Sequence, residues 1–205
     1  MRTVPLDDLA NALAFVGNSL LAPMTQTESV GLDPSFWKTF PDLGDADVRR
    51  ALEGCTAWAE EARAGNVVGE DMVQQASVEY ACLFVGPPSP AAPPWETMIR
   101  GEGATVGFGK PTFAMQSVLQ EMGLQISNAN NQYADHMGIE LLALSEMLRR
   151  VQTGALDAEK AAAFTREHPA AWMEAFRAKV HEAAPGGYFD HLLAVAETLL
   201  RTVAS

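Results

Sequence analysis

The least generic stretch of the chain runs from Tyr80 to Trp95 and reads Tyr-Ala-Cys-Leu-Phe-Val-Gly-Pro-Pro-Ser-Pro-Ala-Ala-Pro-Pro-Trp. An apolar helical run ends at Gly86, and five prolines follow before Trp95. Proline fixes φ and lacks a backbone N–H, so this segment is neither a helix nor a central strand. A flexible linker would more often consist of glycine and serine. The sequence therefore predicts a stiff, extended segment that holds one large aromatic side chain in a fixed place.

Amphipathic helices are expected on the N-terminal side of this segment. Apolar residues recur at three- and four-residue spacing between Leu6 and Leu20, and again between Met72 and Phe84. Asp33 followed by Pro34 is typical of a helix start, because aspartate caps the first turn and proline fits its first position. Asp45 is expected to cap a longer helix in the same way.

The C-terminal side has the same helical character after a long connection. Residues 86–110 are expected to form one surface loop, since Arg100 to Lys110 is rich in glycine and shows no periodicity. Further helices are expected to start at Pro111, to run from Tyr133 to Val151, and to start at Asp157, at Pro169 and near Tyr188. No segment alternates apolar and polar residues as a strand would. We predict an all-α, single compact domain over residues 1–205, with roughly nine helices and an ordered central loop.

Composition narrows the class of protein and of partner. The chain has 205 residues, of which 48% are hydrophobic and 20% are charged, as in soluble globular proteins. Its 26 acidic and 14 basic residues give a net charge of −12. Such a surface repels nucleic acid and anionic membranes and favours basic partners. Simple solubility is the alternative explanation of this charge.

Compartment is predicted from what the sequence lacks. No apolar run approaches the ~20 residues that a membrane-spanning helix needs. Met1 is followed closely by Pro5, Asp7 and Asp8, which is unlike an export signal. Cys55 and Cys82 lie in predicted apolar helical faces and form no CxxC pair. A cytoplasmic protein without a membrane span is the expectation.

A glycine-rich loop from Gly101 to Lys110 superficially resembles a phosphate-binding loop. The spacing is wrong, because Ala104 stands where a glycine is required and Pro111 stands where serine or threonine would hold magnesium. No strand precedes the loop either. A loop that leads into a helix start is the preferred interpretation.

Asp135, His136 and Glu140 form the one cluster that suggests chemistry. His136 and Glu140 are one helical turn apart, so they can share a proton or a ligand. No HExxH pattern or second histidine accompanies them, and we expect no metal. A cap or dipole partner at a helix start is the alternative role for Asp135. Neither a nucleophile elbow nor an activated cysteine is present, so the sequence does not require an enzyme.

Three separated signatures resemble one family. They are Leu-Phe-Val-Gly-Pro with Pro-Pro-Trp-Glu-Thr at 83–97, Asp-His-Met-Gly-Ile-Glu-Leu at 135–141, and His-Pro-Ala-Ala-Trp at 168–172 with Tyr188 downstream. Their order and separation resemble the TorD/DmsD family of molybdoenzyme maturation chaperones from about Tyr80 to the C-terminus. The chain departs from the pattern at Gln132 to Ala134, where the family often has Glu-Pro, and at Pro88, where some members have tryptophan.

The resemblance implies an all-α cytoplasmic chaperone and not an enzyme. Its implied partners are the twin-arginine signal peptide and the apo form of a molybdopterin-containing oxidoreductase, which it holds until the cofactor is inserted, before export. No cofactor of its own is implied. The residues that correspond to the family's leader-binding positions are Trp95, Asp135 and His136, and with them Tyr80, Phe84 and Glu140.

Physical chemistry agrees with this role. A twin-arginine leader has a basic front and an apolar middle, so it suits carboxylates beside an exposed aromatic surface. Asp135 is expected to pair with a leader arginine and Trp95 to anchor the apolar part. We predict that Trp95 and Asp135-His136 meet in space as opposite walls of one groove.

Two other functions remain open from the sequence. One is a nucleotide-dependent enzyme that uses the Gly101–Lys110 loop with Asp135, His136 and Glu140. The other is an adaptor whose acidic surface binds a basic protein. Weak nucleotide binding, and a domain-swapped dimer in place of a monomer, are also left open.

Overall fold

The structure is a computed structural model that describes residues 5–101, 107–127 and 132–204. Its regular elements are α1 (Leu6–Leu21), η1 (Met24–Gln26), η2 (Ser29–Leu32), α2 (Pro34–Thr39), α3 (Ala46–Val67), α4 (Met72–Tyr80), η3 (Ala81–Val85), α5 (Glu96–Arg100), α6 (Lys110–Glu121), α7 (Met137–Gln152), α8 (Ala158–Glu167), α9 (Pro169–Ala183) and α10 (Tyr188–Ala204). Within the described ranges no strand is present, and the predicted all-α fold is confirmed.

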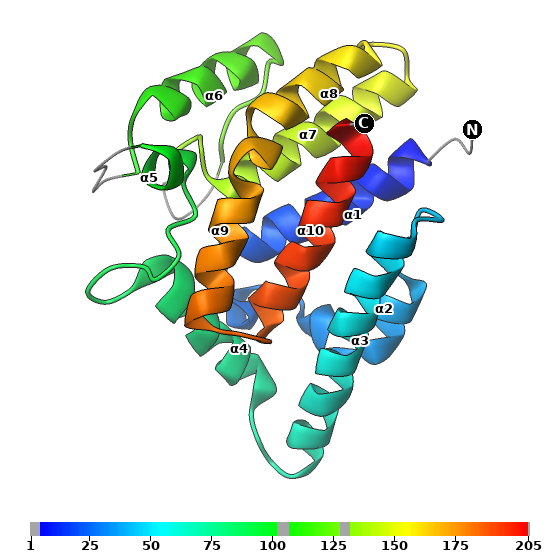
Figure 1. Cartoon of the computed structure of the whole chain (residues 1–205), viewed down its shortest axis with the longest axis vertical. Helices are drawn as coiled ribbons and strands as arrows, with labels where there is room; N and C mark the ends of the chain where they lie inside the picture. Colours follow the sequence, from blue (N-terminus) through cyan, green and yellow to red (C-terminus); the bar gives the residue numbers. More distant parts are fainter. Residues whose placement is uncertain (1–4, 102–106, 128–131, 205) are drawn as a thin grey trace.

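The C-terminal helix α10 occupies the middle of the molecule. It lies between α3 and α9, and α1 passes behind it alongside α7 (Figure 1). Ten of its residues are buried, which fits its strongly apolar sequence. The core is therefore built around α10, α1 and α7, and the other helices close over these three.

The contact between α1 and α7 depends on two glycines that face each other. A Cβ atom on Gly138 would lie 2.6 Å from the carbonyl oxygen of Gly17, and one on Gly17 would lie 2.8 Å from the carbonyl oxygen of Gly138. Real Cβ atoms do not approach backbone oxygens so closely. Glycine at both positions therefore lets the start of α7 lie directly on α1.

Helix starts follow the capping residues seen in the sequence. The carboxylates of Asp33, Asp45 and Asp157 accept hydrogen bonds from backbone N–H groups of the first turns of α2, α3 and α8. Helix α7 begins at Met137, later than the expected Tyr133, because His136 caps it. The His136 Nδ1 atom accepts a hydrogen bond of 3.0 Å from the backbone N–H of Gly138.

The segment after α4 is more closely packed than the expected surface loop. Gly86, at φ +97°, ends the helical run in a conformation that other residues rarely adopt. Backbone N–H groups of Ala91 and Ala92 then donate to carbonyls of η3 at 3.2 and 2.8 Å, and Ala92 is buried. The predicted loop also contains α5. Cys82, expected on an apolar face, is exposed.

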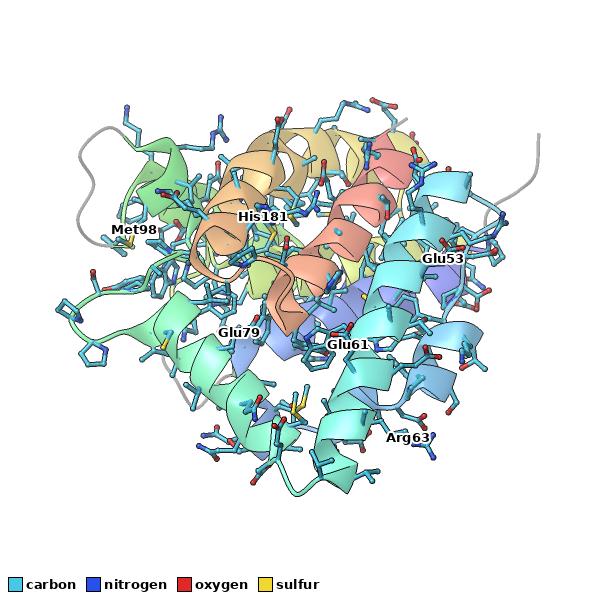
Figure 2. All side chains as sticks on the ribbon, turned by 60° about the horizontal axis from the view of Figure 1, so that its bottom comes forward. Glu53, Glu61, Arg63, Glu79, Met98 and His181 are labelled. Carbon is cyan, nitrogen blue, oxygen red and sulfur yellow. The ribbon has the colours of Figure 1, made fainter. Side chains whose placement is uncertain are left out.

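Charged side chains of the bundle lie in two different environments, one exposed to solvent and one partly buried. Glu53, Glu61 and Arg63 project from the outer side of α3 (Figure 2). Glu79 instead is partly buried and accepts hydrogen bonds from the backbone N–H groups of Tyr188 and Phe189 at 3.1 and 2.9 Å. This carboxylate connects α4 to the start of α10. No helix of the described ranges is long and apolar enough to cross a membrane.

Candidate functional site

Trp95 and the start of α7 are held side by side by their backbones. Trp95 and His136 form an isolated antiparallel bridge. The backbone N–H of Glu96 donates to the Asp135 carbonyl at 2.9 Å, and that of Met137 donates to the Pro94 carbonyl at 2.9 Å. The proline-rich segment therefore ends against the first residues of the longest predicted helix of the C-terminal half, although some forty residues separate the two in the sequence.

Trp95 belongs to a group of exposed aromatic side chains, which we call the aromatic patch: Trp95, Phe108, Phe113 and Tyr133. Ring centroids lie 6.5 Å apart for Trp95 and Tyr133, 5.4 Å for Tyr133 and Phe108, and 5.1 Å for Phe108 and Phe113. Phe108, Phe113 and Tyr133 are 44%, 56% and 42% exposed, and Trp95 is partly exposed. Large aromatic side chains gathered on a surface are typical of a protein-binding site.

One glycine and one histidine set the orientation of the Trp95 ring. A Cβ atom on Gly107 would lie 2.8 Å from ring atoms of Trp95, so only glycine lets the chain lie against the indole there. On another side the His136 ring meets it edge-on, with centroids 5.8 Å apart. The indole Nε1 is buried and has no partner among the described residues. Trp95 is therefore held in place by packing, with part of its surface left open.

Asp135 precedes His136, the residue that pairs with Trp95, but it has no exposed surface. Its Oδ2 atom accepts from the backbone N–H of Thr97 at 3.0 Å and from the Thr97 hydroxyl at 2.6 Å, and its Oδ1 atom accepts from the Thr112 hydroxyl at 2.9 Å. Thr112 Oγ1 accepts in turn from the backbone N–H of Gly109 at 3.0 Å. One carboxylate thus joins the starts of α5, α6 and α7, so Asp135 is not an open wall of a groove.

His136 is neutral in this setting. Burial lowers the pKa of its imidazole from 6.5 to about 3. Its Nδ1 atom is the acceptor that caps α7, and its buried Nε2 atom has no partner within the described ranges. The cap at this helix is His136 and not Asp135, which was the alternative role expected for the aspartate.

Glu140 lies one turn further along α7 and is also fully buried. Its Oε2 atom accepts a hydrogen bond of 3.0 Å from the indole N–H of Trp172 on α9. Burial, together with the nearby charge of Glu96, raises the pKa of Glu140 well above its usual value. Glu96 in contrast is paired with Arg100 and lies 3.3 Å from Nδ1 of His168. Burial alone would raise its pKa, but these two partners outweigh burial and lower it.

Tyr80 and Phe84 lie in the core below the proline-rich segment. Their rings contact each other at 5.3 Å and both contact Phe189 of α10. Tyr80 also lines a cavity of about 570 Å³ beside η1, and burial raises the pKa of its hydroxyl to about 12. Both residues are buried in the core and do not belong to the aromatic patch.

The structure thus brings Trp95, Asp135, His136 and Glu140 together, with Tyr80 and Phe84 one layer further in. Thr97, Thr112 and Glu96 are not predictable as site residues from the sequence, because nothing in their spacing connects them to Asp135 or Glu140. Phe108 and Phe113 likewise give no signal, because they stand in or next to the expected loop. Residues 102–106 of the glycine-rich loop lie outside the described residues.

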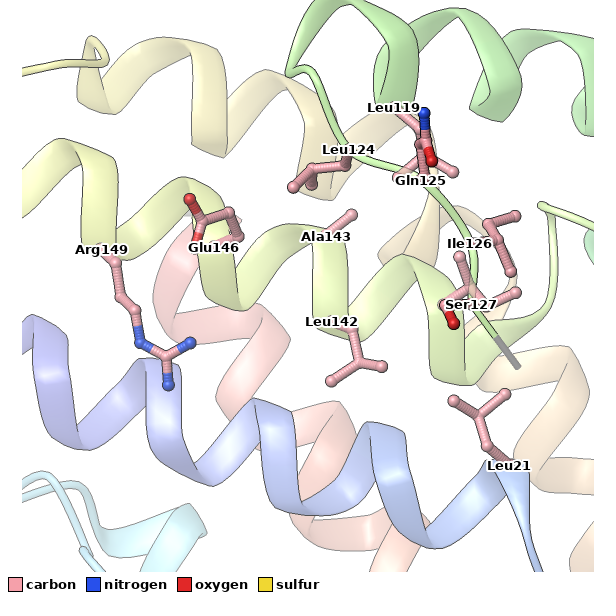
Figure 3. Close-up of a pocket in the computed structure, with 11 residues that line it drawn as sticks. Leu21, Leu119, Leu124, Gln125, Ile126, Ser127, Leu142, Ala143, Glu146 and Arg149 are labelled. Atoms are coloured by element: carbon pink, nitrogen blue, oxygen red, sulfur yellow. The ribbon is translucent and has the colours of Figure 1, made fainter. Parts of the chain in front are cut away.

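A second apolar surface lies between α1, α7 and the connection that follows α6. Leu21, Leu124, Ile126 and Leu142 line this groove of about 370 Å³ (Figure 3). Glu146 and Arg149 stand at one end of it, and Ile126 is 39% exposed. The groove and the aromatic patch both border the connection between α6 and α7.

Comparison with known proteins supports the resemblance drawn from the sequence. Residues 43–178 match the family model described as nitrate reductase delta subunit. The match covers more than half of the 205-residue chain and includes Trp95, Asp135, His136 and Glu140. No curated protein matches the chain. The chain therefore belongs to the nitrate reductase delta subunit family, a family of non-catalytic chaperones within the TorD/DmsD/NarJ group of redox-enzyme maturation proteins.

Proposed function

We propose that this protein is a cytoplasmic maturation chaperone that binds the twin-arginine signal peptide of a molybdopterin-containing oxidoreductase. It holds the apoenzyme until the cofactor is inserted and thereby delays export. Family membership supports the general role. The observation that carries the assignment to a surface is the aromatic patch, in which Trp95 is fixed against the start of α7.

The aromatic patch is suited to the apolar middle of a leader peptide. Its rings are large, held by neighbouring rings, and partly open to solvent, so they lose little conformational freedom when a peptide binds. The net charge of −12 draws the basic front of the leader toward the protein and raises the rate of encounter. The aromatic contacts then supply most of the affinity, and the negative charge of the protein steers the basic front of the leader toward it.

In this proposal Trp95 touches the leader, and the other predicted site residues position it. Asp135 is occupied by Thr97 and Thr112 and holds three helix starts together. His136 caps α7, Glu140 ties α7 to Trp172 of α9, and Tyr80 and Phe84 pack in the core just before the proline-rich segment. Direct pairing of Asp135 with a leader arginine would require these hydrogen bonds to break, so we assign it a positioning role.

Peptide-binding measurements on two tryptophan variants test whether the aromatic patch is the binding surface. We expect Trp95→Ala to weaken binding of a fluorescently labelled twin-arginine leader peptide by about 10- to 100-fold, as hot-spot residues do. Trp58→Ala is the control, because Trp58 is also partly exposed but lies on α3 against Tyr188. Circular dichroism should show the same helix content in both variants.

Two outcomes would overturn the proposal. If Trp95→Ala binds the leader as tightly as the wild type, the aromatic patch is not the binding surface. If a peptide with both arginines replaced by lysine binds equally well, the protein recognises only positive charge and an apolar run, as an acidic adaptor would. Nucleotide turnover is not expected, because the family is non-catalytic.

A further inference from the structure

Glu96, Glu140 and His168 meet inside the protein although they come from three different elements. Glu96 begins α5, Glu140 is in the first turns of α7, and His168 joins α8 to α9. Each offers one ligand atom, and these atoms all lie within 4.8 Å of one another. Both glutamates are buried, and the His168 side chain is only 12% exposed. Two carboxylates and an imidazole in this arrangement form a compact set of metal ligands.

The hydrogen bonds of this cluster are incomplete. Glu140 uses its Oε2 atom for Trp172, while its fully buried Oε1 atom accepts no hydrogen bond from a donor of the described residues. The carboxyl group of Glu140 also lies within hydrogen-bond reach of Glu96, so a proton shared between the two carboxylates is the alternative to a cation. A buried carboxylate oxygen without a partner is costly unless a proton or a cation satisfies it. Glu96 also keeps one oxygen for His168, at a long 3.3 Å, while its other oxygen pairs with Arg100. A cation bound here would therefore replace the long contact between Glu96 and His168 and would satisfy the buried oxygen of Glu140.

The cluster is also accessible from outside. A cavity of about 560 Å³ is lined by Glu96 and His168, together with Thr97, Arg100, Lys110 and Glu167. Glu140 does not line this cavity and is fully buried. The cavity therefore opens onto two of the three side chains, Glu96 and His168, and a water molecule in it can complete the coordination of an ion.

We propose that Glu96, Glu140 and His168 bind a divalent transition-metal ion such as Zn²⁺. The imidazole favours this class over Mg²⁺ or Ca²⁺, which take oxygen ligands. Ligand bonds of about 2.0 to 2.2 Å place tetrahedral ligand atoms about 3.5 Å apart, so each side chain moves inward by less than about 1 Å. Arg100 stays on the outer oxygen of Glu96. Binding displaces the proton of Glu140 and the hydrogen between Glu96 and His168.

The ion would connect α5, α7 and the start of α9. A metal that binds only the folded state raises its stability by mass action. The site lies beneath Trp95, since Glu96 directly follows it and Glu140 is one turn beyond His136. The proposal does not depend on leader binding, because its test measures the metal itself.

Metal titration of the purified full-length chain tests this site. The protein is first treated with a chelator and desalted, then titrated with Co²⁺ and with Zn²⁺. We expect one Co²⁺ per chain with visible absorption bands of a four-coordinate site, displaced by Zn²⁺, and a Tm raised by about 5 °C in excess Zn²⁺. Glu140→Gln and His168→Gln are expected to weaken binding at least about 10-fold.

Glu167→Gln is the matched control, since Glu167 is an exposed carboxylate that lines the same cavity but contributes no ligand. It should bind metal as the wild type does. Glu140→Gln is expected to stay folded, because its amide oxygen can still accept from Trp172 and its amide group can donate to Glu96. If the wild type binds no stoichiometric metal, or if Glu140→Gln binds as tightly as the wild type, a shared proton occupies the cluster and the proposal is wrong.

Discussion

Replacing Asp135 by asparagine tests whether this residue holds the structure together. The side chain has the same shape but loses its charge. The backbone N–H of Thr97, which now donates to Oδ2 at 3.0 Å, requires an acceptor, so the amide oxygen must face Thr97. The amide NH₂ group then faces Thr112, whose hydroxyl proton loses its acceptor because its oxygen already accepts from Gly109.

The expected cost follows from the contacts that are lost. One hydrogen bond to a charged group is worth about 1.5 to 3 kcal/mol. The negative charge of Asp135 beside a helix N-terminus contributes about 0.3 to 1 kcal/mol to the stability of the folded protein. We therefore expect Asp135→Asn to lower the free energy of unfolding by about 3 kcal/mol. Asp135→Ala should cost more, about 4 kcal/mol, because all three donors lose their partner.

Urea unfolding followed by circular dichroism measures this difference. Asp157→Asn is the control, since Asp157 is an exposed N-cap of α8 and asparagine caps equally well, so its change should stay below about 0.5 kcal/mol. If Asp135→Asn is as stable as the wild type yet no longer binds the leader, Asp135 is a ligand-binding residue and our assignment is wrong.

Two further predictions concern α7. We expect Gly138→Ala to lower the free energy of unfolding by about 1 to 3 kcal/mol, because the new Cβ meets Gly17, and an unchanged Tm would contradict this close approach. Burial lowers the pKa of His136 from 6.5 to about 3, so the folded state binds a proton on this side chain less readily than the unfolded state does. The free energy of unfolding should therefore fall as the pH drops below 6.5, by about 2 kcal/mol at pH 5. His136→Asn keeps a cap without titrating, so urea midpoints at pH 7 and pH 5 should differ less than in the wild type, and an equal difference would exclude His136 as the cause.

The sequence by itself determined the helical class and several of the helix starts. Periodic apolar residues and the caps Asp33, Asp45 and Asp157 were read correctly, because helix starts depend on local backbone groups. The prolines before Trp95 also act locally, since each restricts its own φ. The motifs around Trp95 and Asp135-His136 were enough to indicate the family.

Only the tertiary structure decided where the predicted site residues lie and what they contact. An aspartate before a helix has the same sequence signature whether it caps, binds a ligand or ties distant segments together. Burial of Asp135 and its bonds to Thr97 and Thr112 depend on α5 and α6 folding back onto the start of α7. The meeting of Glu96, Glu140 and His168 likewise depends on how helices distant in sequence pack, because desolvation and hydrogen-bond partners are properties of the packed chain.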